Sequence, residues 1–288
     1  MKDTLSAPIA KPLTVIEPVH GWQLISLNEL WQYRDLLYFF VWRNIKVRYK
    51  QTILGASWAI LEPFTTMVVF SVFFGELAKI PSNGIPYPLF SFTGLVPWTF
   101  FSVGVSGMTS SVVGTSGMLK KIYFPRLIIP ISQLASSFVD FLLAFLVLLA
   151  MIAAYSLTGE AHIHISFNIL WLLPLMVLEV ITALGVGLWL SALNVQFRDV
   201  AHATAFILRL WMFITPVIYP SSMLGSHWQL IYSLNPMVGV TEGFRWALLG
   251  TDTSPNVMIV ASVATALALL VSGVMYFSRM EKTFADIV

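Results

Sequence analysis

Cysteine is absent from this chain of 288 residues, and charged residues make up only 10% of it. Without cysteine the chain can form no disulfide, no thiolate metal site and no cysteine nucleophile. Ordinary soluble domains carry about 25% charged residues, whereas 57% of this chain is hydrophobic. The composition therefore excludes an ordinary soluble fold and indicates a helical protein that crosses a membrane several times.

The sequence motifs of several enzyme classes are also missing. No glycine is followed by lysine, which excludes the phosphate-binding loop G-x-x-x-x-G-K-[ST]. Neither H-E-x-x-H nor G-x-S-x-G occurs. His162 and His164 alternate in a polar stretch, where a two-histidine metal site is one interpretation and an ordinary hydrated loop is the one we favour. We expect no catalytic residue, no metal and no cofactor in this chain.

Long apolar runs, in contrast, are abundant. A helix needs about 20 predominantly apolar residues to cross a bilayer. The predicted fold is an all-α polytopic membrane protein, with six transmembrane helices in the domain 53–279. The predicted spans lie at about 53–75, 89–116, 127–157, 168–194, 200–220 and 255–278. Gly104, Gly107 and Ser111 in the second span have the spacing that lets helices pack closely.

The first 52 residues divide into a tail and a helix. Residues 1–25 contain three prolines and lack the apolar core of a secretory signal peptide, so we expect a disordered cytoplasmic tail. Ser26 and Glu29 fit a capping box, which opens an amphipathic helix over 26–52. We expect this helix to lie in the membrane interface, and a cytosolic helix with a solvated charged face is the alternative. Its predicted apolar stripe is Tyr38, Trp42, Ile45 and Tyr49.

Lysine and arginine gather on one side of the predicted spans. Thirteen of them fall on the side that six spans assign to both termini, and two fall on the opposite side. Because cytoplasmic loops collect Lys and Arg, we expect both termini to be cytoplasmic, including residues 280–288. The turn between the second and third spans carries Lys120, Lys121 and Arg126 on this side. A plain cationic loop explains these cations but leaves the exposed apolar segment 122–124 unexplained.

The connection between the fifth and sixth spans is too apolar for a loop in water. Asn235 and Pro236 form a helix start, and Gly250 is a helix stop. A helix between them is about 21 Å long, less than the hydrocarbon core of about 30 Å. We predict short re-entrant helices here, with Glu242 and Arg245 paired on one face.

Four ionisable side chains fall inside the predicted spans: Glu62, Asp140, Glu179 and Arg209. Each costs about 2.5–3.5 kcal/mol at mid-bilayer on insertion scales, so each should face a partner or a cavity. A proton relay and internal pairing are the two interpretations. We favour internal pairing, because Asp140 and Glu179 have no polar neighbours in the sequence.

Five stretches, in order, resemble one family. They are RYKQTILGASWAILEPF (48–64), LKKIYFPRLIIP (119–130), NVQFRDV (194–200), SLNPMVGVTEGFRWALLG (233–250) and FSRMEKTFADIV (277–288). Together they are similar to the membrane subunit, or permease, of type-2 ATP-binding cassette exporters. The resemblance runs over roughly 26–288 and points to the branch that exports lipid-linked polysaccharides: O-antigen, capsule and teichoic acid.

The resemblance implies a homodimer in the bacterial inner membrane that assembles with two copies of a separate ATPase subunit, which binds ATP and Mg²⁺. The expected cargo is a lipid-linked glycan, and no nucleic acid is expected. A drug or small-lipophile exporter is the alternative within the class. An ATP-independent carrier is a further alternative, but a matching broken helix after the second span is missing.

The resemblance also assigns candidate site residues. The segment that docks on the ATPase comprises Met118, Leu119, Lys120, Lys121, Ile122, Tyr123, Phe124 and Arg126. A pyrophosphate arriving at the cytoplasmic interface would seek the charge-assisted hydrogen bonds of Arg43, Lys46, Arg48 and Lys50. Candidates for the channel or its gate are Phe70, Phe73, Trp98, Phe100, Asn235, Pro236, Glu242 and Arg245. Lipid-facing or core packing is the alternative for the aromatic residues.

Overall fold

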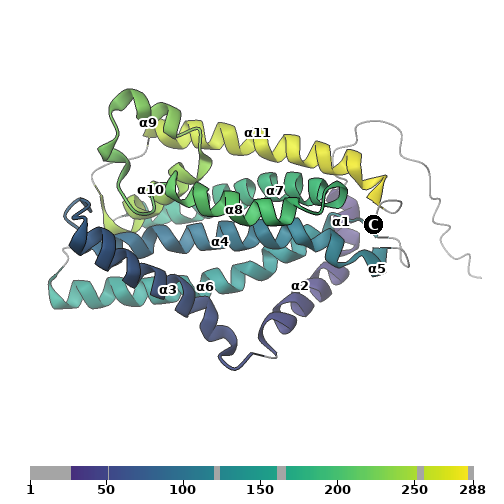
Figure 1. Cartoon of the computed structure of the whole chain (residues 1–288), viewed down its shortest axis with the longest axis horizontal. Coiled ribbons are helices and arrows are strands. Elements are labelled where there is room, and N and C mark those ends of the chain that lie inside the picture. Colours follow the sequence, from purple (N-terminus) through teal and green to yellow (C-terminus); the bar gives the residue numbers. More distant parts are fainter. Residues whose placement is uncertain (1–26, 51, 120–123, 161–166, 252–255, 285–288) are drawn as a thin grey trace, which may run out of the picture.

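In a computed structural model, the described part of the chain covers residues 27–50, 52–119, 124–160, 167–251 and 256–284. Its regular secondary structure is helical, and the described ranges contain no strand. Within them, five helices are long and apolar enough to cross a membrane, and a sixth apolar helix is shorter. The predicted all-α membrane fold is confirmed. Figure 1 shows the long helices side by side, with α9 and α10 near one end of the bundle and α1 and α5 at the other.

The long helices overlap the predicted spans. They are α3 (Trp58–Phe70), α4 (Tyr87–Gly114), α6 (Ile128–Thr158), α7 (Leu172–Gln196) and α11 (Asn256–Glu281). A 3-10 turn, Gly55–Ser57, precedes α3, and a π-helical segment, Ser71–Leu77, follows it, so that 55–77 has the length of one span. A second 3-10 turn, Phe167–Trp171, precedes α7.

The fifth predicted span is shorter than expected. Helix α8 (Val200–Phe213) has 14 residues, about 21 Å of helix against a hydrocarbon core of about 30 Å. The prediction of 200–220 was therefore wrong at its C-terminal end. Pro216 and Pro220 lack the backbone N–H that a continuing helix needs, and the chain passes instead through turns over 214–220.

Two short helices occupy the connection between α8 and α11, as predicted. They are α9 (Ser226–Tyr232) and α10 (Pro236–Leu249), and a 3-10 turn, Ser221–Met223, precedes them. The side chain of Asn235 accepts a hydrogen bond from the Met237 N–H at 3.1 Å, which caps the start of α10. Gly250 ends α10 with a φ of 68°, a left-handed conformation that glycine adopts without strain.

The N-terminal helix is divided in two. α1 (Leu27–Gln32) and α2 (Arg34–Tyr49) meet at Tyr33, whose φ of −96° and ψ of 20° are not helical. α2 packs on α6 and diverges from α3 in Figure 1. Residues 1–26, with the predicted tail and Ser26, lie outside the described residues, as do 285–288.

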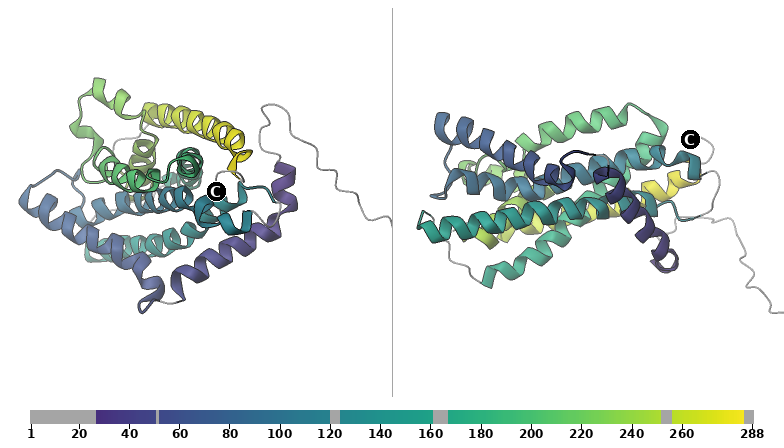
Figure 2. Two further views of the ribbon diagram at one scale, coloured as in Figure 1. Left: turned by 45° about the vertical axis from the view of Figure 1, so that its right-hand side comes forward. Right: turned by 90° about the horizontal axis from the view of Figure 1, so that it is seen from below.

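Helix α4 is the centre of the bundle. It packs against α3, α6, α7, α8 and α10, and Figure 2 shows it surrounded by other helices. Of its most apolar window, 78% of residues are buried, against 17% for the span at 55–77, so the latter lies at the surface. A Cβ atom at Gly104 or Gly107 would collide with Leu134 or Gln133 of α6. The predicted close helix approach at these glycines is confirmed.

Candidate functional site

A cavity of about 690 Å³ opens on one side of the bundle, between α3, α4, α6 and α8. Its wall combines charged groups, hydroxyl and amide groups, and flat aromatic faces. Among the wall residues are Arg48, Tyr49, Trp58, Glu62, Trp98, Phe100, Gln133, Ser137, Asp140, Phe141 and Arg209. Such a wall can hydrogen-bond polar ligands, pair with charge and stack against ring faces.

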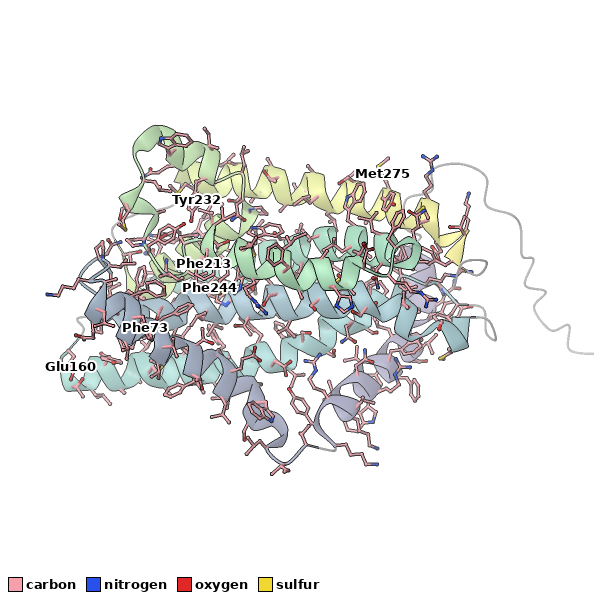
Figure 3. All side chains as sticks on the ribbon, viewed as in Figure 1. Phe73, Glu160, Phe213, Tyr232, Phe244 and Met275 are labelled. Carbon is pink, nitrogen blue, oxygen red and sulfur yellow. The ribbon has the colours of Figure 1, made fainter. Side chains whose placement is uncertain are left out.

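The predicted channel aromatics fall into two groups. Trp98 and Phe100 lie in the cavity wall, but each side chain is only 4% exposed, in accord with the core-packing alternative. Phe70 is buried and packs edge-on against Phe74, with ring centroids 5.4 Å apart. Phe73 is 57% exposed on the surface of the span, at the position labelled in Figure 3. Neither Phe70 nor Phe73 is among the described residues of the wall, so the structure places only the α4 pair at the cavity.

At one edge of the cavity, Asp140 of α6 is paired with the end of α2. Arg48 donates a hydrogen bond to one carboxylate oxygen of Asp140 and forms an ion pair with it. The Tyr49 hydroxyl donates to the other carboxylate oxygen. Internal pairing is confirmed for Asp140. Arg48, which we expected to be available to a pyrophosphate, already has a partner within the chain.

The other interfacial cations differ in their surroundings. The Arg43 guanidinium lies 4.6 Å from the ring centroid of Phe40 and donates a 3.3 Å hydrogen bond to Asn44. Partial burial lowers its pKa, but an arginine stays protonated at neutral pH. Lys46 and Lys50 are exposed, and no ion pair joins them to an acid in the described ranges.

The predicted docking segment is described at both of its ends. Lys120, Lys121, Ile122 and Tyr123 lie outside the described residues. Leu119 ends α5 (Ser116–Leu119), and Met118 is partly buried against the core.

Phe124 was expected to be exposed, and this prediction was wrong. Its side chain is 3% exposed, and its ring centroid lies 5.8 Å from that of Phe40 on α2. Apolar packing beneath α2 removes the ring from solvent. Phe124 therefore belongs to the base of the segment, where it connects the turn to the N-terminal helix.

Arg126 connects the same segment to the C-terminal end of α11. Its backbone N–H donates to the Glu281 carboxylate at 3.0 Å, and its guanidinium donates to the Glu281 backbone carbonyl. The guanidinium also lies 5.9 Å from the ring centroid of Phe284. Sequence reasoning missed Phe40, Glu281 and Phe284. For Phe40 a signal existed in the helical spacing of apolar residues in α2, whereas Glu281 is 155 residues from its partner.

At the α10 end of the bundle, the predicted Glu242–Arg245 pair is present and fully buried. The Nη1 atom of Arg245 lies 3.5 Å from Oε1 of Glu242. Arg245 also donates to the backbone carbonyls of Phe90 at 3.3 Å, Val217 at 2.7 Å and Pro216. These bonds satisfy a buried guanidinium from several sides. They fasten α10 to α4 and to the turn after α8.

Three further hydrogen bonds lie around this pair. Glu242 accepts a hydrogen bond from the Ser221 N–H at 2.8 Å. The hydroxyl of Tyr87 donates to the Ile218 carbonyl at 2.8 Å, and the hydroxyls of Tyr219 and Tyr232 lie 3.0 Å apart. Burial raises the pKa of Tyr232 far above its ordinary value, so this phenol stays protonated. Figure 3 labels Tyr232 at this end of the bundle.

Three other ionisable groups in the spans lack such partners among the described residues. Glu179 is buried in α7, and its Oε1 atom has no hydrogen-bond partner in the described part of the chain. Glu62 and Arg209 lie in the cavity wall and are exposed. No ion pair joins either of them to an opposite charge among the described residues.

The described residues contain no group of three His, Cys, Asp or Glu side chains that could hold a metal ion. His162 and His164 lie outside these residues. The arrangement combines a polar and aromatic cavity wall, cations on α2 near one end of the bundle, and the buried Glu242–Arg245 pair near the other end.

Comparison with known proteins identifies the family. Residues 35–249 match the ABC-2 type transporter family. The O-antigen export system permease protein RfbA of Myxococcus xanthus is 32% identical over 265 residues, which are 90% of this chain and 98% of that protein. A protein of the same name from Klebsiella pneumoniae is 28% identical, over 88% of this chain and 95% of its own.

A more distant relative has a different name. The polysialic acid transport protein KpsM of Escherichia coli is 24% identical over 241 residues, which are 83% of this chain and 91% of that protein. The family match spans most of the helical bundle, and the relatives align over nearly their whole lengths. The chain belongs to the ABC-2 type transporter family.

Proposed function

We propose that this chain is the permease subunit of an ATP-binding cassette exporter that moves lipid-linked polysaccharide across a bacterial inner membrane. The observation that carries the proposal is the similarity to an O-antigen export permease, which covers 90% of this chain and 98% of the relative. The polysialic acid transport protein, aligned over 83% of this chain, supports the same branch. One name describes export of O-antigen and the other describes transport of polysialic acid.

The chemistry of the cavity supports this cargo. A lipid-linked glycan combines sugars, an anionic head and an apolar tail, and the three need different surfaces. Trp58 is 54% exposed and offers a flat face for sugar rings, and hydroxyl and amide groups of the wall offer hydrogen bonds. Lys46 of α2 and Lys50, which directly follows it, are exposed and have no ion-pair partner among the described residues, so they are available to the anionic head. Arg48 serves a different purpose, because it holds Asp140.

The assembly we propose is a homodimer with two copies of an ATPase subunit. The chain has no phosphate-binding loop, so the ATP and Mg²⁺ that drive transport belong to that partner. The excess of cations on one side supports cytoplasmic positions for both termini. The segment 118–126, with its cluster of basic residues, is then the surface nearest to the ATPase.

A mechanical route from that segment into the membrane follows from its contacts. Phe124 packs on Phe40 of α2, and Arg126 is bonded to Glu281 of α11. Movement of the segment during ATP hydrolysis would therefore move α2 and α11 together. Because Arg48 and Tyr49 at the end of α2 hold Asp140 at the cavity edge, displacement of α2 would also reshape that edge.

The experiment that tests this function is deletion of the gene in its host and complementation with the wild-type chain. The expected result is loss of surface polysaccharide with accumulation of lipid-linked glycan on the cytoplasmic side, and full recovery on complementation. Wild-type surface polysaccharide after deletion, with new sensitivity to lipophilic drugs, would instead indicate a drug exporter. Removal of the ATPase gene should reproduce the phenotype of the permease deletion.

A further inference from the structure

Helix α11 differs from the other four long helices because its sequence contains no proline. α3 contains Pro63, and α4, α6 and α7 contain Pro97, Pro130 and Pro174. Proline is a common cause of helix kinks, because it removes a backbone hydrogen bond and clashes with the preceding turn. α11 has 26 residues, which correspond to about 39 Å of uninterrupted helix. Figure 1 shows it along the bundle, from α9 at one end to the end that carries α5.

The end of α11 at Glu281 holds Arg126, the last residue of the docking segment. The Arg126 backbone N–H donates to the Glu281 carboxylate at 3.0 Å, and the guanidinium donates to the Glu281 carbonyl. Phe284 is completely buried, with its ring centroid 5.2 Å from that of Phe277 and 5.9 Å from the Arg126 guanidinium. The last turn of α11 and the residues just after it therefore form one packed unit with Arg126.

The opposite end of α11 packs on both α9 and α10. The hydroxyl of Ser262, which is completely buried, donates to the carbonyl of Ser233 at 3.0 Å, and Ser233 directly follows α9. A Cβ atom at Gly239 of α10 would lie only 2.6 Å from the Ser262 Oγ, so α10 packs closely on the same residue. Ser262 and Glu281 are 19 residues apart on one helix, a distance of about 28 Å.

Between these two ends, α11 is fixed to α7. A Cβ atom at Gly273 would lie 2.5 Å from the Gly185 carbonyl oxygen, so the two backbones are in contact. One turn further along, the rings of Trp189 and Tyr276 stack with centroids 4.2 Å apart, and the indole N–H of Trp189 donates to the Ser272 hydroxyl at 3.0 Å. Close backbone packing and a stacked ring pair resist sliding of one helix along the other. The middle of α11 should therefore move together with α7.

The other connection of the docking segment leads to a different place. Phe124 packs on Phe40 of α2, and α2 ends at Tyr49, where Arg48 and Tyr49 hold Asp140 at the cavity edge. Movement of α2 therefore changes the cavity. Movement that arrives at α9 and α10 needs another carrier, and α11 contacts both Arg126 and these two helices.

We propose that α11, fixed to α7, is the rigid element that carries movement of the docking segment to α9 and α10 at the opposite end of the bundle. Glu281 and Ser262 are the positioning residues at its two ends. The inference rests on the proposed function, since an ATPase that moves the docking segment is part of that function. The positions of α9 and α10 then depend on the nucleotide state of the ATPase.

A fluorescent label on α9 tests this transmission in the whole complex. Trp228 of α9 is 66% exposed, and Trp228→Cys gives a single labelling site because the natural chain contains no cysteine. The labelled permease is assembled in lipid nanodiscs with a cysteine-free form of its ATPase. Its emission is measured before and after ATP and vanadate trap the ATPase. The emission should change on trapping, and an unchanged emission would overturn the proposal.

One substitution at each end of α11 should weaken this response. Glu281→Ala removes the acceptor of the Arg126 N–H, and Ser262→Ala removes the bond to Ser233 but retains the Cβ atom that packs against Gly239. Each should reduce the emission change by about fivefold or more, within the range of coupling between distant sites. Glu281→Gln keeps an oxygen acceptor for the Arg126 N–H and should restore most of the response.

Matched controls lie on the same helix. Arg279→Ala removes an exposed cation from the last turn, and Thr265→Ala removes a hydroxyl that donates to the Ala261 carbonyl within α11. Neither should change the response. Leu267 is 46% exposed between the two ends. Leu267→Pro introduces a kink there and should abolish the response, whereas Leu267→Ala shortens the same side chain without a kink and should preserve it.

ATP hydrolysis and export distinguish transmission from stability. In Glu281→Ala and Ser262→Ala, recovery of the ATPase on the tagged permease and ATP hydrolysis per complex should stay near wild type, while glycan export falls. If export falls only in proportion to the amount of assembled complex, these residues merely hold the fold and the proposal is overturned. Should Leu267→Pro fail to assemble, the two end variants decide the question.

The same measurements separate this inference from the proposed function. A complex that exports drugs instead of glycan, but whose emission change depends on Glu281 and Ser262, overturns the proposed cargo and leaves the transmission intact. Glycan export with an emission change that is equal in all variants overturns the transmission and leaves the proposed function intact.

Discussion

Arg245 and Glu242 form an ion pair inside the protein, with Nη1 and Oε1 3.5 Å apart and both side chains buried. The two residues are adjacent on one face of α10, but their other hydrogen bonds reach α4, the turn after α8 and Ser221. The pair therefore holds together segments that are far apart in the sequence. It makes α10 part of the bundle.

The first prediction concerns the removal of one partner of this pair. Arg245→Ala should lower the free energy of unfolding by about 3–5 kcal/mol, because it leaves a buried carboxylate and three backbone carbonyls without their donor. Export should fall, while the subunit still assembles with its ATPase at the other end of the bundle. Thermal unfolding of the purified complex and recovery of the ATPase on the tagged permease measure the two effects.

A double-mutant cycle sharpens this test. Glu242→Ala should also destabilise, and the combination with Arg245→Ala should cost less than the sum of the single changes, because it leaves no orphaned charge. Additive losses would show that the two side chains act independently. Loss of ATPase binding in either single variant would contradict a role confined to this end of the bundle.

The second prediction compares two neighbouring aromatic residues of the docking segment, Phe124 and Tyr123. Phe124→Ala should destabilise the permease by about 3–5 kcal/mol, because it empties a buried site against Phe40. Tyr123→Ala should instead leave the unfolding temperature unchanged and weaken binding of the ATPase, if that side chain anchors the interface. Tyr38→Ala is the control on α2, since Tyr38 is 72% exposed. If Phe124→Ala and Tyr123→Ala lowered stability equally, the different roles expected for these two side chains would be contradicted.

The third prediction concerns the pairing of Arg48 with Asp140. Asp140→Leu alone should destabilise by about 3 kcal/mol or more, since it leaves a partly buried guanidinium without its acid. Arg48→Met together with Asp140→Leu should recover most of that stability. If the pair serves only to hold α2 on α6, the double variant should also regain export. Recovered stability without recovered export would show that Arg48 also contacts the cargo.

Much of this fold could be predicted from local sequence. Long apolar runs predict the helices because a bilayer fixes their length, and Asn235, Pro236 and Gly250 mark α10 through capping chemistry. The end of α8 was misjudged, because apolar composition continues beyond Phe213 although the helix does not. Local sequence rules thus predict where a helix begins more reliably than where it ends.

The contacts between distant segments could not be predicted in this way. The apolar stripe expected on the N-terminal helix included Tyr38 and Trp42, which are exposed, whereas Phe40 is the side chain that α2 buries completely. The choice depends on the position of Phe124, which packing of the whole bundle decides. Asp140 is 92 residues from Arg48, and a helical period carries no information about such a partner. The Glu242–Arg245 pair was predictable because it lies within one helical turn.

The fourth prediction is that the purified chain hydrolyses no ATP by itself. It lacks the phosphate-binding loop, so hydrolysis should require the ATPase subunit, and the two should co-purify from membranes. A colorimetric phosphate assay on the detergent-solubilised chain, with and without its partner, measures this. ATP hydrolysis that stays with the isolated chain through successive purification steps would contradict the assignment of this activity to a separate subunit.

The last prediction fixes the orientation of the bundle in the membrane, and the cysteine-free chain makes it direct. Glu160, two residues after α6, and Ser222, before α9, are exposed and lie where the outer connections are expected. Thr283, after α11, is exposed where the cytoplasmic terminus is expected. With an impermeant maleimide on intact spheroplasts, Glu160→Cys and Ser222→Cys should react at once, and Thr283→Cys only after lysis. Thr251 is a poor reporter, because its side chain is buried. Reaction of Thr283→Cys before lysis, with protection of the other two, would show the opposite orientation of the bundle. The buried Glu242–Arg245 pair would then lie on the side where the ATPase was expected.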